Sequence, residues 1–443
     1  MSQLMSPNVR SGVNMEVAPS RPAGSNLELT QALAVSFSYP PETEPRAIQV
    51  SRLLRHLEIS TVLVCASSAA EIGGHGLGDA ESFLKSTLRV PLRVGPWRKA
   101  INVIARRVYI PVFSRTPDPL LPWRKPALEK IAAFISKTGY RPDVLLTFAF
   151  PLVDSLIGLE LKRRYGFPWL AHFSDPWTDS PFRTDDRLTR ALNLRLERKV
   201  IEQADLIVFT SEETADLIMA KYEPRLREKV RVVPHAYEPE LFQVNGLATD
   251  KGRLAVRFLG DLYLLRTPKP LFDALRVLGT TKGSLLEKFC FEIVGSMHDL
   301  APQETDLSGL PKDLVVFRPR VGYLQSLELM SSAAGLMVID APAERNAKSV
   351  FLPSKLIEYV GAGRPVIGLT PPGAAAELIS RLGGWVADPA DTACIAAMIE
   401  RFLMYVLENY GRRLETWGRP EVRQEYEVTA VAKKFQKIVQ ELV

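Results

Sequence analysis

Several features that mark specialised classes of protein are scarce in this sequence. Three cysteines in 443 residues, Cys65, Cys290 and Cys394, are widely separated and have apolar neighbours. This pattern predicts buried, reduced thiols and excludes a disulfide framework. No run approaches the roughly 18 apolar residues of a membrane-spanning helix. Residues 1–26 are polar and lack the apolar stretch of a secretory signal. We therefore expect a cytoplasmic chain whose residues 1–27 form a disordered tail.

A strong excess of one charge is also missing. The net charge of +6 is modest for this length, and the isoelectric point is near 9.1. This balance indicates an anionic ligand or surface as the partner and argues against nucleic acid.

The length predicts two domains, because one domain usually holds ~100–200 residues. Short β-branched or apolar runs alternate with amphipathic stretches in both halves, which is typical of parallel sheets covered by helices. The expected strands are 33–40, 61–66, 144–150, 169–175, 206–210 and 230–234, then 254–259, 291–294, 314–317, 335–339 and 365–369. Helices are expected over 46–57 and 187–203. We predict an α/β chain with a first domain at 28–243, a second at 244–408 and a helical segment at 409–443 that packs back on the first domain.

Ligands of doubly wound sheets bind where loops follow the strands, next to helix N-termini. Three such loops in the sequence carry polar candidates. The first contains Pro41, Glu42 and Arg46, the second His172 and Asp175, and the third Arg266.

A fourth loop leads into the run Pro353 to Pro365, which has the chemistry of a nucleotide site. Pro353 suits the first turn of a helix, and Lys355 and Glu358 are three residues apart, so they share one face near its start. The helix terminus, Ser354 and Lys355 favour phosphate, and a lone carboxylate suits ribose hydroxyls. The alternative is that Lys355 and Glu358 form an ordinary exposed pair.

These pieces, in this order, resemble glycosyltransferase family four, the retaining GT-B enzymes that build bacterial surface polysaccharides and glycolipids. The resemblance spans roughly Ala34 to Met404. The matching segments are the opening strand with its Pro-Pro loop, 141–144, 167–169, 175–177, 203–207, 230–235 and 353–365. It implies two Rossmann-like domains facing a cleft, a nucleotide-sugar donor, a saccharide or lipid-linked acceptor, and a ribose contact from Glu358.

The sequence also departs from the family pattern. Many members carry a glutamate where this chain has Val350, so the contact to the donor sugar is unassigned. Asp340 or Glu344 could supply a carboxylate, although loop-surface positions are the simpler interpretation of both. A lysine that should follow Arg266 by five residues is replaced by Leu271, and only Arg266 carries over as a phosphate contact.

The chemistry implied by the resemblance needs charge stabilisation on the departing diphosphate. Arg266, Lys355 and helix N-termini would supply it without metal or cofactor, since the chain lacks the Asp-x-Asp triplet of metal-dependent GT-A enzymes. His172 and Asp175 are candidates to face the donor sugar or the acceptor. The alternatives are a buried core histidine and a simple Asp-Pro turn.

Two other functions stay open from the sequence: a sugar-nucleotide epimerase of the same shape, and a non-catalytic member of a polysaccharide-assembly complex.

Residues 82–125 carry ten basic side chains and one acidic one, Asp118, interleaved with aromatic and aliphatic residues. This segment predicts a peripheral contact with anionic lipid on the inner face of the cytoplasmic membrane, with a solvated helix face as the alternative.

Overall fold

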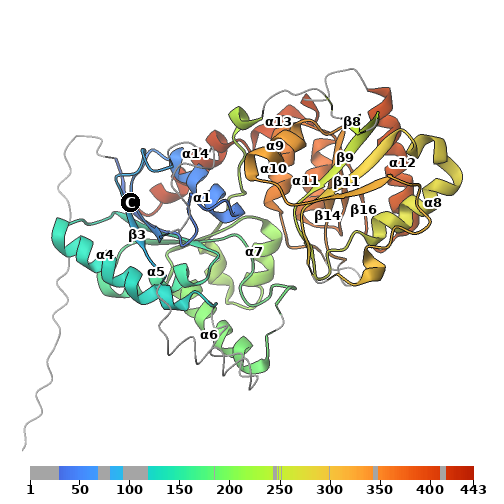
Figure 1. Ribbon diagram of the computed structural model, residues 1–443. Helices are drawn as coiled ribbons and strands as arrows, with labels where there is room; N and C mark the ends of the chain where they lie inside the picture. Colours follow the sequence, from blue (N-terminus) through green and yellow to red (C-terminus); the bar gives the residue numbers. More distant parts are fainter. Residues whose placement is uncertain are drawn as a thin grey trace, which may run out of the picture.

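The computed structural model describes residues 29–67, 80–92, 118–183, 185–242, 247, 249–250, 252–298, 300–342, 348–409 and 416–443. The predicted tail at 1–27 lies outside them, as does most of the basic segment 82–125. The described residues form two α/β domains, side by side in Figure 1.

The first domain is built on a parallel sheet with the strand order β3-β2-β1-β4-β5-β6-β7. Its strands are β1 (Gln31–Val35), β2 (Ser60–Ala66), β3 (Ser86–Val90), β4 (Val144–Ala149), β5 (Trp169–Phe173), β6 (Leu206–Phe209) and β7 (Val230–Val232). The central strands are buried on both faces, as expected when helices cover both sides. The order reverses between β1 and β4, and the loops that follow these two strands therefore diverge and leave a crevice.

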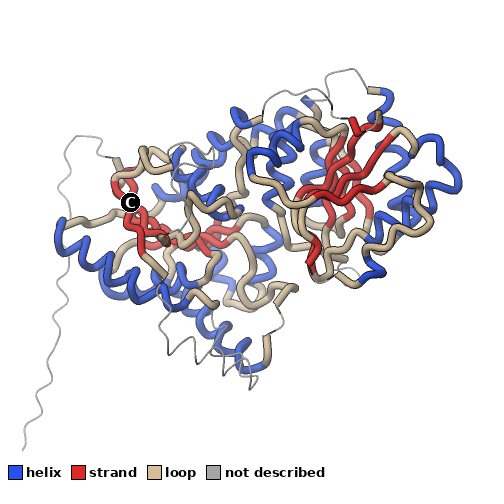
Figure 2. The backbone as a smooth tube through the Cα atoms, viewed as in Figure 1, coloured by secondary structure: helices blue, strands red, loops and turns tan. Residues whose placement is uncertain are grey.

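Helices cover both faces of this sheet (Figure 2). One face packs against α4 (Arg124–Thr138), α5 (Val153–Tyr165), α6 (Arg187–Gln203) and α7 (Glu212–Met219). The other face packs against α1 (Pro45–Arg55) and, from the end of the chain, α14 (Val428–Gln440). Phe435 of α14 stacks on Phe148 of β4 at a ring distance of 6.3 Å. The last helix is thus part of the first domain's core.

The second domain repeats the architecture with the order β13-β11-β9-β14-β15-β16. Its strands are β9 (Arg253–Leu259), β11 (Phe289–Val294), β13 (Val315–Arg318), β14 (Gly335–Ile339), β15 (Val366–Leu369) and β16 (Trp385–Ala387), with the short β8 (Thr249–Asp250), β10 (Leu262–Tyr263) and β12 (Met297–His298). Helices α8 (Lys269–Leu286) and α12 (Thr392–Glu408) pack on one face. Helices α9 (Tyr323–Ser331), α10 (Ser354–Ala362), α11 (Ala374–Leu382) and α13 (Pro420–Gln424) lie with the other. The switch point here lies between β9 and β14.

Some expectations from the sequence were wrong. Edge strands β3 and β16 were not predicted, because Ser86–Val90 is polar and Trp385–Ala387 is only three residues long, and neither has the apolar run of a central strand. Cys65 and Cys290 are buried as predicted, but Cys394 is exposed at the start of α12. No helix among the described residues is both long and apolar enough to cross a membrane.

Candidate active site

A cleft of about 970 Å³ lies between the two domains, at the switch points of both sheets. The first domain lines it with the loops that follow β1, β4 and β5. The second domain lines it with Tyr263 of β10, Arg266 after β10, Arg320 after β13, and residues 351–355 before and within the first turn of α10. The cleft therefore lies where doubly wound sheets bind ligands.

The second-domain wall of the cleft is cationic. Arg266, Arg320 and Lys355 line it, and Lys355 lies in the first turn of α10, where the helix dipole already favours an anion. The pKa of Lys355 is lowered to about 7, mainly by burial and further by the positive charge of Arg266. Lys355 makes no ion pair with the described residues, and its Nζ lies 4.0 Å from the Phe258 ring centre. Gly260 allows this position, because a Cβ there would collide with the Lys355 side chain.

Arg266 is held from three directions. Its Nε donates to Asp340 Oδ1 at 3.1 Å, and its Nη1 donates to the hydroxyl of Tyr263 at 2.8 Å. Three aromatic rings surround the guanidinium, with Cζ at 4.8 Å from Phe182, 5.4 Å from Phe351 and 5.5 Å from Tyr263. The orientation of the Arg266 guanidinium is therefore fixed before any ligand arrives.

Asp340 is buried, and the expectation of a loop-surface residue was wrong. It is 3% exposed, and its second oxygen accepts from Ser349 Oγ at 2.6 Å. Asp340 thus holds Arg266 with one carboxylate oxygen and, through Ser349, the loop before α10 with the other. Glu344, the other carboxylate considered, lies outside the described residues.

The first-domain wall presents Arg46 together with carboxylates. Arg46 Nη2 donates to Nδ1 of His172 at 3.0 Å. Burial and the Arg46 charge hold the pKa of His172 well below its usual value, and the pKa of His235 at about 3, so both imidazoles are neutral. His172 does not line the cleft; it lies behind Arg46, against Phe148 and Phe435. Its position fits the alternative of a core histidine better than contact with substrate.

Three carboxylates line the same wall: Glu44, Asp118 and Asp175. Burial raises the pKa of Asp175, while Ser174, Arg46 and Arg266 oppose that shift. Burial likewise raises the pKa of Asp118, which accepts from the backbone amides of Leu120 and Val153. Carboxylates with raised pKa values in a cleft are candidates for proton transfer with a substrate hydroxyl.

Glu358 does not line this cleft. It lies one turn deeper in α10, is 6% exposed, and accepts from Arg52 Nη1 of α1 at 3.0 Å and from Tyr323 Oη at 3.2 Å. Burial raises its pKa against the opposing charge of Arg52. The alternative of an exposed Lys355–Glu358 pair was wrong, because Glu358 is buried and pairs with Arg52, whereas Lys355 is half-buried and lines the cleft.

The predicted site residues as a whole divide into those that line the cleft and those that do not. Asp175, Arg266, Lys355, Ser354 and Arg46 line the cleft, whereas Pro41 and the exposed Glu42 do not. Position 350, where the family pattern has a glutamate, contributes its backbone: the Val350 carbonyl accepts from Thr214 Oγ1 at 2.7 Å and from Ser211 Oγ at 3.2 Å. These two hydroxyls belong to the start of α7, so the position joins the domains.

The sequence did not point to the aromatic residues Phe182, Tyr263 and Phe351 or to Asp118. Phe182 follows β5 and Phe351 follows β14, which is the signal that could have included these two residues, whereas Tyr263 belongs to the short strand β10. Their roles depend on contacts across the cleft that no local pattern encodes.

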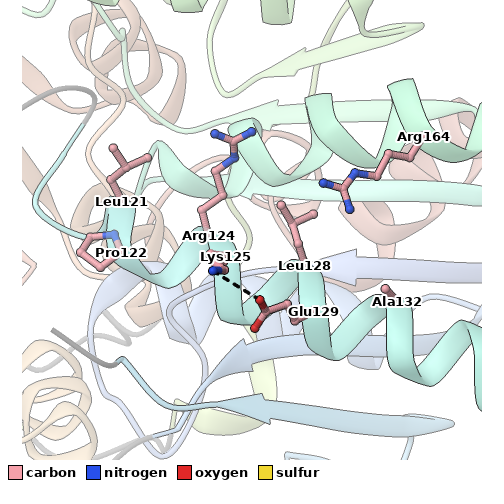
Figure 3. A pocket seen from close by; sticks show the side chains of 8 residues that line it. All are labelled: Leu121, Pro122, Arg124, Lys125, Leu128, Glu129, Ala132 and Arg164. Atoms are coloured by element: carbon pink, nitrogen blue, oxygen red, sulfur yellow. Dashed lines mark ion pairs between the residues drawn. The ribbon is translucent and has the colours of Figure 1, made fainter. Parts of the chain in front are cut away.

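A second hollow, of about 720 Å³, lies on the outside of the first domain (Figure 3). It is lined by the start of α4 and by Arg164 of α5, and Lys125 Nζ lies 3.8 Å from Glu129 Oε1 across one turn. Arg124 and Arg164 both pair with Glu160, so these two cations of the hollow share one carboxylate.

Comparison with known proteins agrees with this geometry. Residues 80–241 match the family model described as Glycosyltransferase Family 4. No curated protein sequence matches the chain.

Solved structures resemble nearly the whole chain. Sucrose-phosphate synthase from Thermosynechococcus elongatus is similar with a TM-score of 0.65 at 16% identity, over 93% of this chain and 99% of that one. HepE from Anabaena, in complex with UDP-glucose, is similar with a TM-score of 0.59 at 13% identity, over 93% and 99%. These likenesses confirm the two-domain GT-B fold.

Proposed function

We propose that this chain, a family 4-like glycosyltransferase with the GT-B fold, transfers a sugar from a nucleotide-sugar donor to a hydroxyl of a saccharide or lipid-linked acceptor. We further propose that the transfer retains anomeric configuration, needs no metal ion, and serves surface polysaccharide or glycoconjugate synthesis in the cytoplasm.

The observation that carries this proposal is the cationic second-domain wall. Arg266, Lys355 and the N-terminus of α10 converge on one cleft, and this is the chemistry that a diphosphate requires. Donors with a uridine base are the first to test, because HepE forms complexes with UDP-glucose and UDP.

The two walls of the cleft suggest separate roles, one toward the donor diphosphate and the other toward the acceptor hydroxyl. Breaking the bond from the anomeric carbon to the diphosphate leaves negative charge on phosphate, which Arg266 and Lys355 are placed to stabilise. The diphosphate would raise the pKa of Lys355, so the lysine is protonated when the donor is bound. Asp175 and Asp118 on the opposite wall are placed to orient an acceptor hydroxyl and take up its proton.

The ribose contact of Glu358 stays a prediction. Its Oε2 is buried and has no hydrogen-bond partner among the described residues, whereas its Oε1 binds Arg52 and Tyr323. A ribose hydroxyl would have to reach Oε2 beside this existing pair.

A thermal-shift panel of UDP-, GDP-, dTDP- and ADP-sugars tests the proposal first. A ligand at 100 times its dissociation constant stabilises by ~2.7 kcal/mol, so a true donor is readily identified. Release of nucleoside diphosphate is then measured with and without saccharide and lipid-linked acceptors, in buffer with and without a chelator. Tight donor binding with no turnover across the acceptors would support the non-catalytic alternative instead.

A sugar-nucleotide epimerase stays a second candidate because the structure brings Glu44, Asp118 and Asp175 to one wall. Such an enzyme needs acid and base groups beside the donor sugar. Incubation with the donor alone, followed by NMR of the sugar, separates the two: an epimerase changes the sugar without an acceptor, and a transferase does not.

The membrane contact is also a proposal. In the described part of segment 82–125, Arg89 pairs with Glu81, Arg124 with Glu160, and Lys85 donates to Gln31. The proposal therefore depends on residues 93–117, which lie outside the described residues. Cosedimentation with anionic vesicles at low and high salt tests it, since each engaged basic residue contributes about 1 kcal/mol. Absence from the pellet at both salt concentrations would contradict it.

A further inference from the structure

Phe182 is a first-domain residue whose ring contacts lie in the second domain. It belongs to the loop between β5 and α6, and its ring stacks on Phe351 with centroids 5.0 Å apart and packs on Tyr263 at 5.7 Å. It also lies closest of the three rings to the guanidinium of Arg266, at 4.8 Å. The loop thus reaches across the cleft and ends on the residue best placed to stabilise a leaving phosphate.

The aromatic cage of Arg266, defined as Phe182, Tyr263 and Phe351, draws on both domains. Tyr263 and Phe351 belong to the same domain as Arg266 and accompany it wherever that domain moves. Phe182 can complete the cage only when the first domain lies against the second. The Arg266 side chain is 12% exposed in the completed cage, and it still lines the cleft.

The ring of Phe182, the third ring of the cage, has a specific electrostatic effect on Arg266. A ring face attracts a guanidinium and excludes water from it, without offering a hydrogen-bond acceptor that would compete with phosphate. Asp340 binds Nε and Tyr263 binds Nη1, so the guanidinium cannot rotate away. A less hydrated, fixed cation stabilises developing charge more strongly than a mobile, solvated one.

We infer that Phe182 is a positioning residue that couples closure of the two domains to the placement of Arg266 on the leaving diphosphate. This inference rests on the proposed function, because it assigns Arg266 to a donor phosphate. It predicts that the donor binds first to the second domain. The Arg266 guanidinium then stabilises the diphosphate fully only after the first domain closes.

The test compares Phe182→Ala with Phe351→Ala. Phe182→Ala should lower kcat about 3- to 30-fold, the range expected from losing a desolvated cation–π contact, and should leave the donor dissociation constant within about twofold. Phe351→Ala should change both, because Phe351 accompanies Arg266 in open and closed forms alike. Phe182→Tyr should restore kcat, and Phe182→Leu, which keeps bulk without a ring face, should not.

A matched control is Tyr165→Ala, which removes a ring stacked on Phe167 at 5.2 Å outside the cleft. It should leave kcat unchanged. Small-angle scattering of the ligand-free protein adds a readout that needs no activity: Phe182→Ala should increase the radius of gyration relative to wild type, and Phe182→Tyr should not.

The outcomes separate the two ideas. Wild type that neither binds UDP-glucose or another donor of the panel nor transfers sugar refutes the proposed function, and the scattering comparison still decides whether Phe182 holds the domains together. An active wild type with a Phe182→Ala variant unchanged in kcat and radius overturns the inference. So does a parallel rise in the donor dissociation constant, which would make Phe182 part of the donor pocket. If Phe182→Ala fails to fold, the comparison of Leu with Tyr decides the question.

Discussion

Two arginines connect the domains, and their surroundings differ in a way that separates structure from function. Arg52 of α1 is 2% exposed; it donates to the Ala236 carbonyl, to Glu358 and to Tyr323, and lies 3.7 Å from Glu238. Burial alone would lower its pKa, but Glu358, Tyr323 and Glu238 together raise it. Arg266, in contrast, has one carboxylate partner and three rings, and part of it still lines the cleft.

The difference distinguishes an arginine that joins the domains from the arginine that we propose acts on the donor phosphate. Around Arg52, Glu238 of the first domain and Glu358 of the second compensate the charge at a buried position that does not line the cleft. Around Arg266, one carboxylate, Asp340, and three neutral rings restrain the guanidinium, and part of the side chain still lines the cleft. Arg266 can therefore still meet a phosphate, whereas Arg52 joins α1 to α10.

Removing Arg52 is the strongest way to break this comparison. Arg52→Ala leaves the buried Glu358 without its cation, and such a loss typically costs about 3–5 kcal/mol of stability. Urea denaturation followed by circular dichroism measures the effect. Arg55→Ala is the control, since Arg55 is one turn away, partly exposed and 3.7 Å from Glu238, and should cost at most about 1 kcal/mol. Equal losses in the two variants would contradict the assignment.

Removing Arg266 should affect turnover more than folding. Arg266→Ala is expected to slow transfer on the order of 10²–10³-fold if the guanidinium stabilises the leaving phosphate. Steady-state kinetics against the donor provides the measurement. Arg320→Ala, on the same wall but with a side chain 67% exposed, should cost less than about tenfold, because its charge is screened by solvent. Wild-type kinetics in the Arg266 variant would remove it from the site.

Glu358→Gln sharpens the comparison, because the two interpretations of Glu358 predict different results. As the partner of Arg52, its neutralisation should cost about 1–3 kcal/mol in urea denaturation, since a buried charge loses its counterion. As a ribose contact, it should raise the donor dissociation constant with little change in kcat. Measuring both quantities on one preparation decides: lower stability with an unchanged dissociation constant would leave Glu358 with the interdomain role alone.

The smallest expected effect is a pH dependence from Lys355. Its pKa near 7 means that donor binding above pH 7 must take up a proton. Donor affinity should therefore be greatest below pH 7 and fall as pH rises, by at most about tenfold per unit, until the pKa of the bound state is reached. Isothermal titration between pH 6 and 9 measures this. Lys355→Arg keeps its charge and should flatten the profile; an identical slope in that variant would assign the titration to another group.

The sequence determined the local structure well. Apolar runs placed the central strands of both sheets, including β14, and the pattern over 187–203 gave α6 with its observed bounds, but the strand expected at 33–40 is β1 at Gln31–Val35. The confirmed resemblance to family 4 was also readable from short segments in order. These features depend on neighbouring residues, whose period and turn chemistry are encoded within a few positions. The edge strand β3 was missed because its residues are polar and half-exposed and have no such period.

Only the tertiary structure decided what the candidate residues do. Glu358 could be placed on a helix from the Pro353 run, but its partner Arg52 is 306 residues away, and spacing carries no information about it. The cage of Arg266 likewise combines residues 182, 263 and 351. His172 follows the same rule, since burial behind Arg46 made it neutral and took it out of the cleft. Desolvation and charge pairing act through space, so the field at each side chain is set by which distant segments the two sheets bring together.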